Sequence, residues 1–204
     1  MNAIDLFLKD HARTHSSAVG GSEGNVYLED GILGGLTGEQ MRTRPQHGVN
    51  SIVWLIWHLA RTEDMSVNVL VAGRPQVIEG DGWSERLGIS PVDIGTGMSD
   101  DEVSDFTGRV DVSAVRAYRA AVGRRTREVM ASMRPEELDE VYDQRRLDEA
   151  FASGAIDERG AWLRGFIGGK TKAFLLGHAC PGHAYMHLGE AMVVRSLLGA
   201  RLPV

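Results

Sequence analysis

Apolar side chains recur every three or four residues along four long stretches of the chain, a spacing typical of helices that bury one face. Polar and charged residues fill most positions between them, as expected where the opposite face of a helix meets water. The helical stretches are predicted over residues 3–36, 50–72, 113–133 and 170–198.

Glycines and capping residues divide the first two stretches. Gly20, Gly21 and Gly24 should break or bend the first one, since each glycine inside a helix costs about 1 kcal/mol relative to alanine. The second stretch opens with Asn50 or Ser51, and either side chain can cap the first turn.

Proline interrupts the fourth stretch. Pro181 lacks the amide donor of an ordinary residue and its ring clashes with the preceding turn, so the helix must kink or start anew there. A new start would make Cys180 the N-cap and Pro181 the first helical residue.

The connections between the long helices carry weaker signals. Residues 77–78 favour an extended pair, and residues 83–87 favour a short helix. Ser99 and Glu102 have the spacing of a capping box, which predicts another short helix after Ser99. The apolar, glycine-rich run 160–169 is predicted to be a loop that packs over the mouth of a site.

Four amphipathic helices with long insertions predict an all-α protein, an antiparallel four-helix bundle with long loop insertions and short extra helices. A chain of 204 residues fits one domain, and we expect residues 1–204 to form it. Bundles of this kind often hold metal ions on side chains that project into the core from facing helices.

Composition narrows the class of protein. The formal net charge of −6 disfavours a nucleic-acid partner, because binding to phosphates needs a basic face. Cys180 is the only cysteine, so no intrachain disulfide can form. The N-terminus has no signal-peptide pattern, and no run reaches the roughly 18 apolar residues of a membrane span. We therefore expect a cytoplasmic protein without a membrane partner.

The candidate chemistry lies in three histidines. His183 and His187 are four residues apart, so on a helix they project from one face and could grip a divalent metal. His58 lies far upstream on a strongly apolar helical stretch, and Trp54, one turn before it, could line the same site. The hypothesis is that folding brings His58 beside the pair. The alternative is that His58 is a packed core histidine and the pair is exposed.

Glu190 is three residues after His187 and projects from the same face. It could be a fourth ligand, an acceptor that orients an imidazole, or a general base; the bland alternative is a salt bridge with Arg195. An orienting or structural role is preferred to direct ligation.

Five other residues carry side chains that could ligate a metal. His178 is five residues before His183 and faces a different direction on a regular helix, so it is left outside the ligand set. His11, His15 and His47 stand in polar or terminal settings and receive no role. Cys180 could be a soft ligand or a reactive thiol, but the preferred interpretation is a small buried residue.

Two windows resemble a known family. The tryptophan-rich run from Trp54 to Glu63, which contains His58, is similar to the second helix of the DinB/YfiT-like superfamily. The run from His183 through His187 and Glu190 to Gly199 is similar to that family's last bundle helix. The resemblance implies a four-helix bundle whose three histidines, by position His58, His183 and His187, hold a divalent metal, usually zinc or nickel. It also implies a homodimer, since many members dimerise.

Some members of that family are thiol-dependent transferases or isomerases that use mycothiol, bacillithiol or glutathione. A metal held by three neutral imidazoles keeps its charge and an open position, and it lowers the pKa of a bound thiol or water molecule. We therefore expect a metal-dependent thiol S-transferase that acts on a small-molecule substrate with a low-molecular-weight thiol as cosubstrate. The alternatives are a non-catalytic metal-binding or structural stress-response bundle, and a metal-dependent hydrolase.

Overall fold

The structure is a computed structural model that describes residues 2–21, 26–89 and 93–201. Helices dominate these residues; no strand occurs among them, and Val141 and Thr171 form an isolated bridge. The predicted all-α bundle with short extra helices is confirmed. The predicted break at Gly20 and Gly21 is also confirmed, because α2 (Ser17–Gly20) ends there, whereas Gly24 lies outside the described residues.

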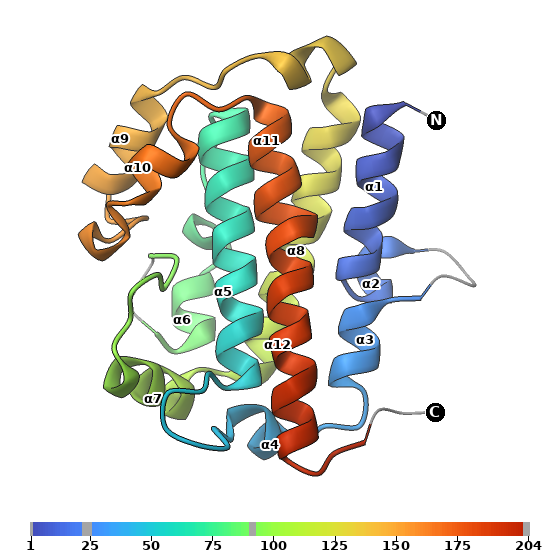
Figure 1. The fold of residues 1–204 in the computed structure, drawn as a ribbon, viewed down its shortest axis with the longest axis vertical. Helices are drawn as coiled ribbons and strands as arrows, with labels where there is room; N and C mark the ends of the chain where they lie inside the picture. The colour runs from blue at the N-terminus through green and yellow to red at the C-terminus, as the bar shows by residue number, and fades with distance from the viewer. Residues whose placement is uncertain (1, 22–25, 90–92, 202–204) are drawn as a thin grey trace.

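Four long helical segments lie side by side in the bundle (Figure 1). The first and the last segment run in one direction, and the two between them run in the other. The long connection between the second and third segments carries the chain back to the end at which the second began. The segments are α1 (Ala3–Thr14), α5 (Ile52–Asp64), α8 (Val112–Ser132), and α11 (Lys172–Gly177) with α12 (His183–Leu197).

The shorter elements cover the ends and one side of the bundle (Figure 1). The predicted short helix over residues 83–87 is confirmed, and so is the capping box at Ser99, whose hydroxyl accepts the amide of Glu102. The remaining elements are α3 (Leu28–Leu33), α4 (Gly38–Arg42), α6 (Trp83–Leu87), α7 (Asp100–Arg109), α9 (Arg145–Ala152), α10 (Leu163–Ile167), and the 3₁₀ turns Val77–Glu79, Pro135–Asp139 and Glu158–Gly160.

Helix α5 is the centre of the molecule. Every residue of it except Thr62 is buried, because α4, α7, α8 and α12 all pack against it. Ser51 caps its first turn by accepting the amide of Trp54 at 3.2 Å, which decides between the two predicted caps. A helix that is apolar nearly all round can only exist in such a covered position.

A buried carboxylate fixes the chain where it leaves α5. Asp64 accepts the amides of Val77 at 2.8 Å and Ile78 at 3.1 Å, and Tyr118 of α8 donates its hydroxyl to the same carboxylate at 2.5 Å. These bonds bend residues 77–79 into a 3₁₀ turn, so the predicted extended pair at 77–78 is wrong.

Two π-helical segments break the regularity of the bundle. Met65–Ala72 (η1) continues α5, and His178–Gly182 (η5) joins α11 to α12. The wide turn of η5 contains Pro181, so the helix continues through the proline, and of the two alternatives considered the new start with Cys180 as N-cap does not occur. Helix α11 packs on η1, and η5 packs on α5. Among the described helices, none has the length and apolar character that crossing a bilayer requires.

Candidate metal centre

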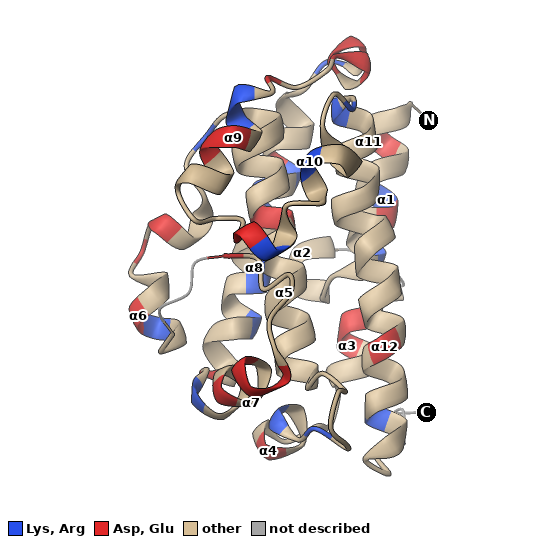
Figure 2. Cartoon of the chain, turned by 60° about the vertical axis from the view of Figure 1, so that its left-hand side comes forward, with Lys and Arg blue, Asp and Glu red and all other residues tan. Residues whose placement is uncertain are grey.

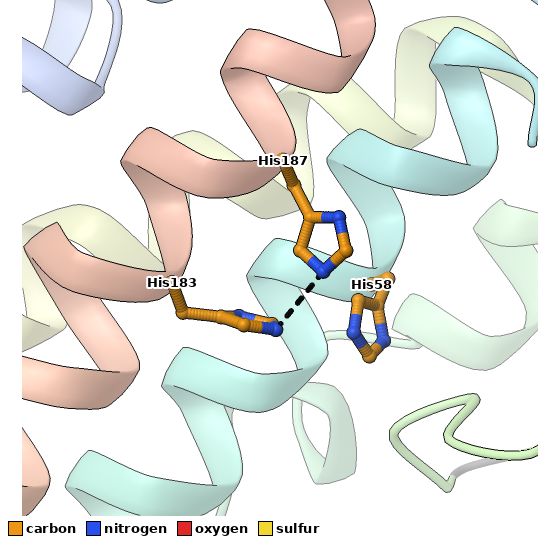
Figure 3. Close-up of side chains that lie close together, drawn as sticks. All are labelled: His58, His183 and His187. Carbon is orange, nitrogen blue, oxygen red and sulfur yellow. Dashed lines mark hydrogen bonds between the residues drawn. The ribbon is translucent and has the colours of Figure 1, made fainter.

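His58 of α5 lies beside His183 and His187 of α12, as Figure 3 shows. Their ligand nitrogens all lie within 4.8 Å of one another. The ring centroid of His58 is 4.9 Å from that of His183 and 5.0 Å from that of His187, and the pair are 4.5 Å apart. The fold therefore brings together the three histidines that the sequence singled out.

The local structure of α5 and α12 orients the three imidazole rings toward one another. The spacing of four residues stacks His183 and His187 on one face of α12, directly after the π-helical turn. On α5, the indole of Trp54 stacks on the ring of His58 with 4.8 Å between centroids and 14° between planes. Trp54 thus lines the site, as predicted, and limits rotation of the His58 ring.

The backbone of residues 94–95 orients His58. Its Nδ1 donates a short hydrogen bond to the carbonyl of Ile94. Gly95 lets this backbone lie directly on α5: its φ is +78°, and a Cβ there would be 2.5 Å from the Trp57 ring. Because Nδ1 carries the proton, Nε2 of His58 presents its lone pair to the other two histidines.

Glu190 orients His187. The Nδ1 of His187 donates to Glu190 Oε2 at 2.8 Å, and Asn50 Nδ2 donates to the other carboxylate oxygen at 3.0 Å. Glu190 therefore takes the role of an acceptor that fixes an imidazole, one of the three proposed for it. The alternative salt bridge with Arg195 is not formed, since that guanidinium donates to the carbonyls of Ile32 and Gly34.

The site is electrostatically suited to a cation. Burial, with the nearby imidazole of His187, lowers the pKa of His58 to about 4. Burial and both neighbouring rings lower the pKa of His183 to about 2. Burial alone would raise the pKa of Glu190, but hydrogen bonds from His187 and Asn50 hold it below its ordinary value. At neutral pH His58 and His183 are thus uncharged, and the Glu190 carboxylate lies beside the group.

The nitrogens of the pair also fit a shared cation. Nε2 of His187 lies 3.1 Å from Nε2 of His183, and Nδ1 of His183 is buried without a hydrogen-bond partner. With the proton of His187 on Nδ1, its Nε2 lone pair points at His183. Imidazole nitrogens that converge in this way suit zinc, nickel, copper or iron. The three imidazoles therefore fit a divalent metal, and they suit zinc, nickel, copper and iron alike.

A cavity of about 460 Å³ opens on the three histidines. Trp54, Met65 and Met98 line it, together with Trp162 and Phe166 from the segment around α10. The run 160–169 was predicted to pack over the mouth of a site as a loop. Its position at the cavity is confirmed, but the run includes the short helix α10.

A second group of ligand-type side chains is formed by His11, His15 and Glu63, whose ligand atoms also lie within 4.8 Å of one another. All three are fully buried, so the predicted polar setting of the two histidines is wrong. Glu63 accepts hydrogen bonds from His11 at 2.8 Å, His15 at 3.0 Å, Arg119 at 2.6 Å and Thr126 at 2.6 Å. A guanidinium already neutralises this carboxylate, so the group is a structural network and a poor metal site.

The remaining candidate residues, His178, Cys180 and His47, lie outside the group of His58, His183 and His187. His178 lines the cavity with its ring 6.2 Å from that of His183, and it stacks on Phe174. Burial holds the pKa of the Cys180 thiol well above its usual value, which agrees with a small buried residue and excludes a reactive thiolate. His47 is exposed and lies 3.1 Å from Asp100.

The comparisons with known proteins agree with this architecture. The crystal structure of a conserved protein from Enterococcus faecalis superposes with a TM-score of 0.66, covers 98% of this chain and 99% of its own, and is 19% identical, a likeness that shows the fold. Comparison with curated proteins gives no match. The sequence profile of the DinB superfamily matches residues 30–191, which is more than half of the sequence, so the chain belongs to the DinB superfamily.

Proposed function

We propose that this protein is a metal-dependent enzyme that transfers the sulfur of a low-molecular-weight thiol, of the mycothiol or bacillithiol type, to a small electrophilic substrate. His58, His183 and His187 hold the metal, which is zinc or nickel. The main support is the convergence of three imidazoles at an apolar cavity in a member of the DinB superfamily.

The residues of the site have distinct tasks. The three imidazoles would hold the cation, which supplies a lowered pKa for a thiol or water molecule near neutral pH. The carbonyl of Ile94 keeps His58 in the tautomer that can ligate, and Glu190 does the same for His187. Trp54 and Met65 keep water away from one side, so a nucleophile in the cavity is poorly solvated.

The cavity supports an enzyme over a closed structural site. A structural metal would be enclosed by four protein ligands, whereas Cys180 is not part of the histidine group. Glu190 already bonds to His187 and Asn50. The histidines instead border a space large enough for a small molecule.

Metal content tests the site itself. Protein purified without an affinity tag should contain about one divalent metal ion per chain by elemental analysis. His183→Ala should lose it, whereas His47→Ala, at an exposed position, should keep it. His15→Gln, in the Glu63 network, should also keep it. Equal metal content in wild type and His183→Ala would remove the proposed site.

Turnover separates the candidate activities. Metal-loaded protein should accelerate transfer from at least one thiol in a panel of mycothiol, bacillithiol, glutathione and simple thiols to an electrophilic reporter, and chelation should abolish the acceleration. Ester cleavage without any thiol would indicate a hydrolase instead. Bound metal without turnover in either assay would indicate a non-catalytic bundle.

We further propose a second copy of this chain as a partner. Helix α12 exposes Tyr185, Met192, Val193 and Leu197, each at 40% or more of its surface. A face of this kind is suited to burial between two copies. Light scattering after gel filtration should give the mass of a dimer, and the mass of one chain at all concentrations would contradict this.

A further inference from the structure

The walls of the cavity lack charge. Its lining among the described residues contains no lysine, arginine, aspartate or glutamate. Six of the lining side chains carry indole, phenyl or thioether groups. These come from Trp54, Trp162, Phe166, Met65, Met98 and Met186.

The charged side chains close to the cavity pair with other protein groups and not with its interior. Arg159 passes behind Gly97, where it pairs with Asp157 at 2.8 Å and with Glu102 at 2.6 Å. Glu190 is held by His187 and Asn50. Figure 2 shows charged residues on the short helices α7 and α9, whose sequences contain arginine, aspartate and glutamate. An anionic group on a ligand would therefore lose its hydration without gaining a cationic side chain in the described walls.

Flat and adaptable surfaces dominate the walls. The Trp54 indole already stacks on His58, and Phe166 meets the His178 ring edge-on with 4.9 Å between centroids. Aromatic rings bind such surfaces by stacking or edge contacts. Methionine side chains adjust to several ring shapes because they are unbranched and polarizable. A cavity of about 460 Å³ holds a compact molecule and not a long chain.

Building on the proposed thiol transfer, we propose that the electrophile is a compact, uncharged aromatic molecule, selected by the apolar walls. A carboxylate on the same ring is rejected, because the described walls supply no lysine or arginine to neutralise its charge. The apolar lining of the cavity therefore selects the electrophile, whereas the three histidines act on the thiol nucleophile through the metal.

A matched pair of reporters tests this selection. In each, the thiol sulfur forms a bond to the ring carbon, chloride leaves with the electrons of the C–Cl bond, and the thiol proton passes to solvent. The reporters are chlorodinitrobenzene and chlorodinitrobenzoate, which differ by a carboxylate. After division by the uncatalysed rate constants, kcat/KM should favour the neutral reporter roughly tenfold or more. Equal values or a preference for the benzoate would overturn the inference.

A binding measurement distinguishes failure of the aromatic selection from failure of the proposed thiol transfer. Unreactive dinitrobenzene should quench the fluorescence of Trp54 and Trp162 in metal-free protein, and dinitrobenzoate should do so only at roughly tenfold higher concentration or above. If no thiol is transferred but this preference in binding holds, the proposed activity fails alone. If transfer occurs while dinitrobenzoate binds as well as dinitrobenzene, the aromatic selection fails alone.

A cation placed at the rim should reduce the preference for the uncharged molecule. Met186 lines the cavity and is 60% exposed, so Met186→Lys is tolerated by the fold. It should improve dinitrobenzoate binding several-fold and leave dinitrobenzene binding nearly unchanged. Ser196→Lys, at an exposed position of the same helix and outside the lining, is the control and should change neither. No gain for the benzoate in Met186→Lys would contradict the assignment of the walls as the selecting element.

Discussion

The carboxylate of Glu190 joins His187, one of the proposed metal ligands, to Asn50, and its effect on the proposed metal site can be isolated by substitution. Glu190→Ala removes the acceptor that fixes the His187 tautomer, so metal affinity should fall roughly 10–100-fold. Glu190→Gln keeps an oxygen acceptor and loses the charge, and its effect should be smaller. Competition titration with a chromophoric chelator measures both.

Glu128→Gln is the control for these variants, because Glu128 pairs only with Arg125 on the surface of α8. It should leave the metal affinity unchanged. A Glu190→Ala protein that binds metal as tightly as wild type would show that Glu190 has no influence on His187.

Glu29 gives the stability of the protein a particular pH dependence. Burial raises the pKa of this carboxyl to about 7, although Arg119 lies nearby. Between its ordinary value and about 7, the folded state holds a proton that the unfolded state has released. Unfolding therefore releases a proton, and the free energy of unfolding falls as pH rises through this window. The loss is complete above the folded pKa.

Glu29→Gln should remove this fall, because the amide does not titrate. Urea unfolding at about pH 5 and about pH 8 should show that the wild type loses on the order of 3 kcal/mol more than the variant. Identical pH dependence in the two proteins would mean that Glu29 is ionised in the folded state throughout.

At the scale of the element, the π-helical turn before α12 sets the direction in which its histidines project. Gly182 closes that turn, and a Cβ there would be 2.9 Å from the carbonyl oxygen of Gly177. Gly182→Ala should therefore shift the start of α12, lower the free energy of unfolding by about 1–3 kcal/mol, and weaken metal binding. Urea unfolding and chelator competition measure the two effects.

Gly189 provides the matched control on the same helix. A Cβ at Gly189 meets no atom within 4 Å, so Gly189→Ala should leave metal binding intact and stabilise the protein by up to about 1 kcal/mol. If both alanine variants behave alike, the close approach at Gly182 does not control the site.

Elements were predictable from the sequence where the signal is local. The capping box at Ser99 and the shared face of His183 and His187 follow from spacing alone. The π-helical turns do not, because a wide turn changes the hydrogen-bond register without changing which residues are apolar. The turn at 77–79 also escaped prediction, since the carboxylate that folds it, Asp64, belongs to another element.

At the scale of the molecule, the sequence indicated a bundle and the cluster of His58, His183 and His187, but not the second histidine group. The pairing of His58 with the distant pair was a hypothesis from residue types on apolar helical stretches, and the family resemblance then supported it. His11 and His15 carried the same spacing of four, yet their burial depends on Glu63 and Arg119 from two other helices. A contact among three helices leaves no trace in any one stretch of sequence.

That second group should hold the bundle together. Glu63 of α5 bonds to His11 of α1, to His15 directly after α1, and to Arg119 and Thr126 of α8. Burial alone would raise the pKa of Glu63, but His15, Arg119 and His11 hold it well below its usual range, so the carboxylate is ionised. Removing it leaves Arg119 buried without this partner, and Glu63→Ala should cost about 3–5 kcal/mol.

Removing both charges distinguishes a buried ion pair from simple loss of packing. The double variant Glu63→Gln with Arg119→Met should be more stable than Glu63→Gln alone, because no buried guanidinium is then left without its carboxylate. Urea unfolding of the two single variants and the double variant gives the coupling free energy. A double variant whose loss equals the sum of the single losses would show that Glu63 and Arg119 act independently. The three helices would then be joined by their apolar contacts and not by this network.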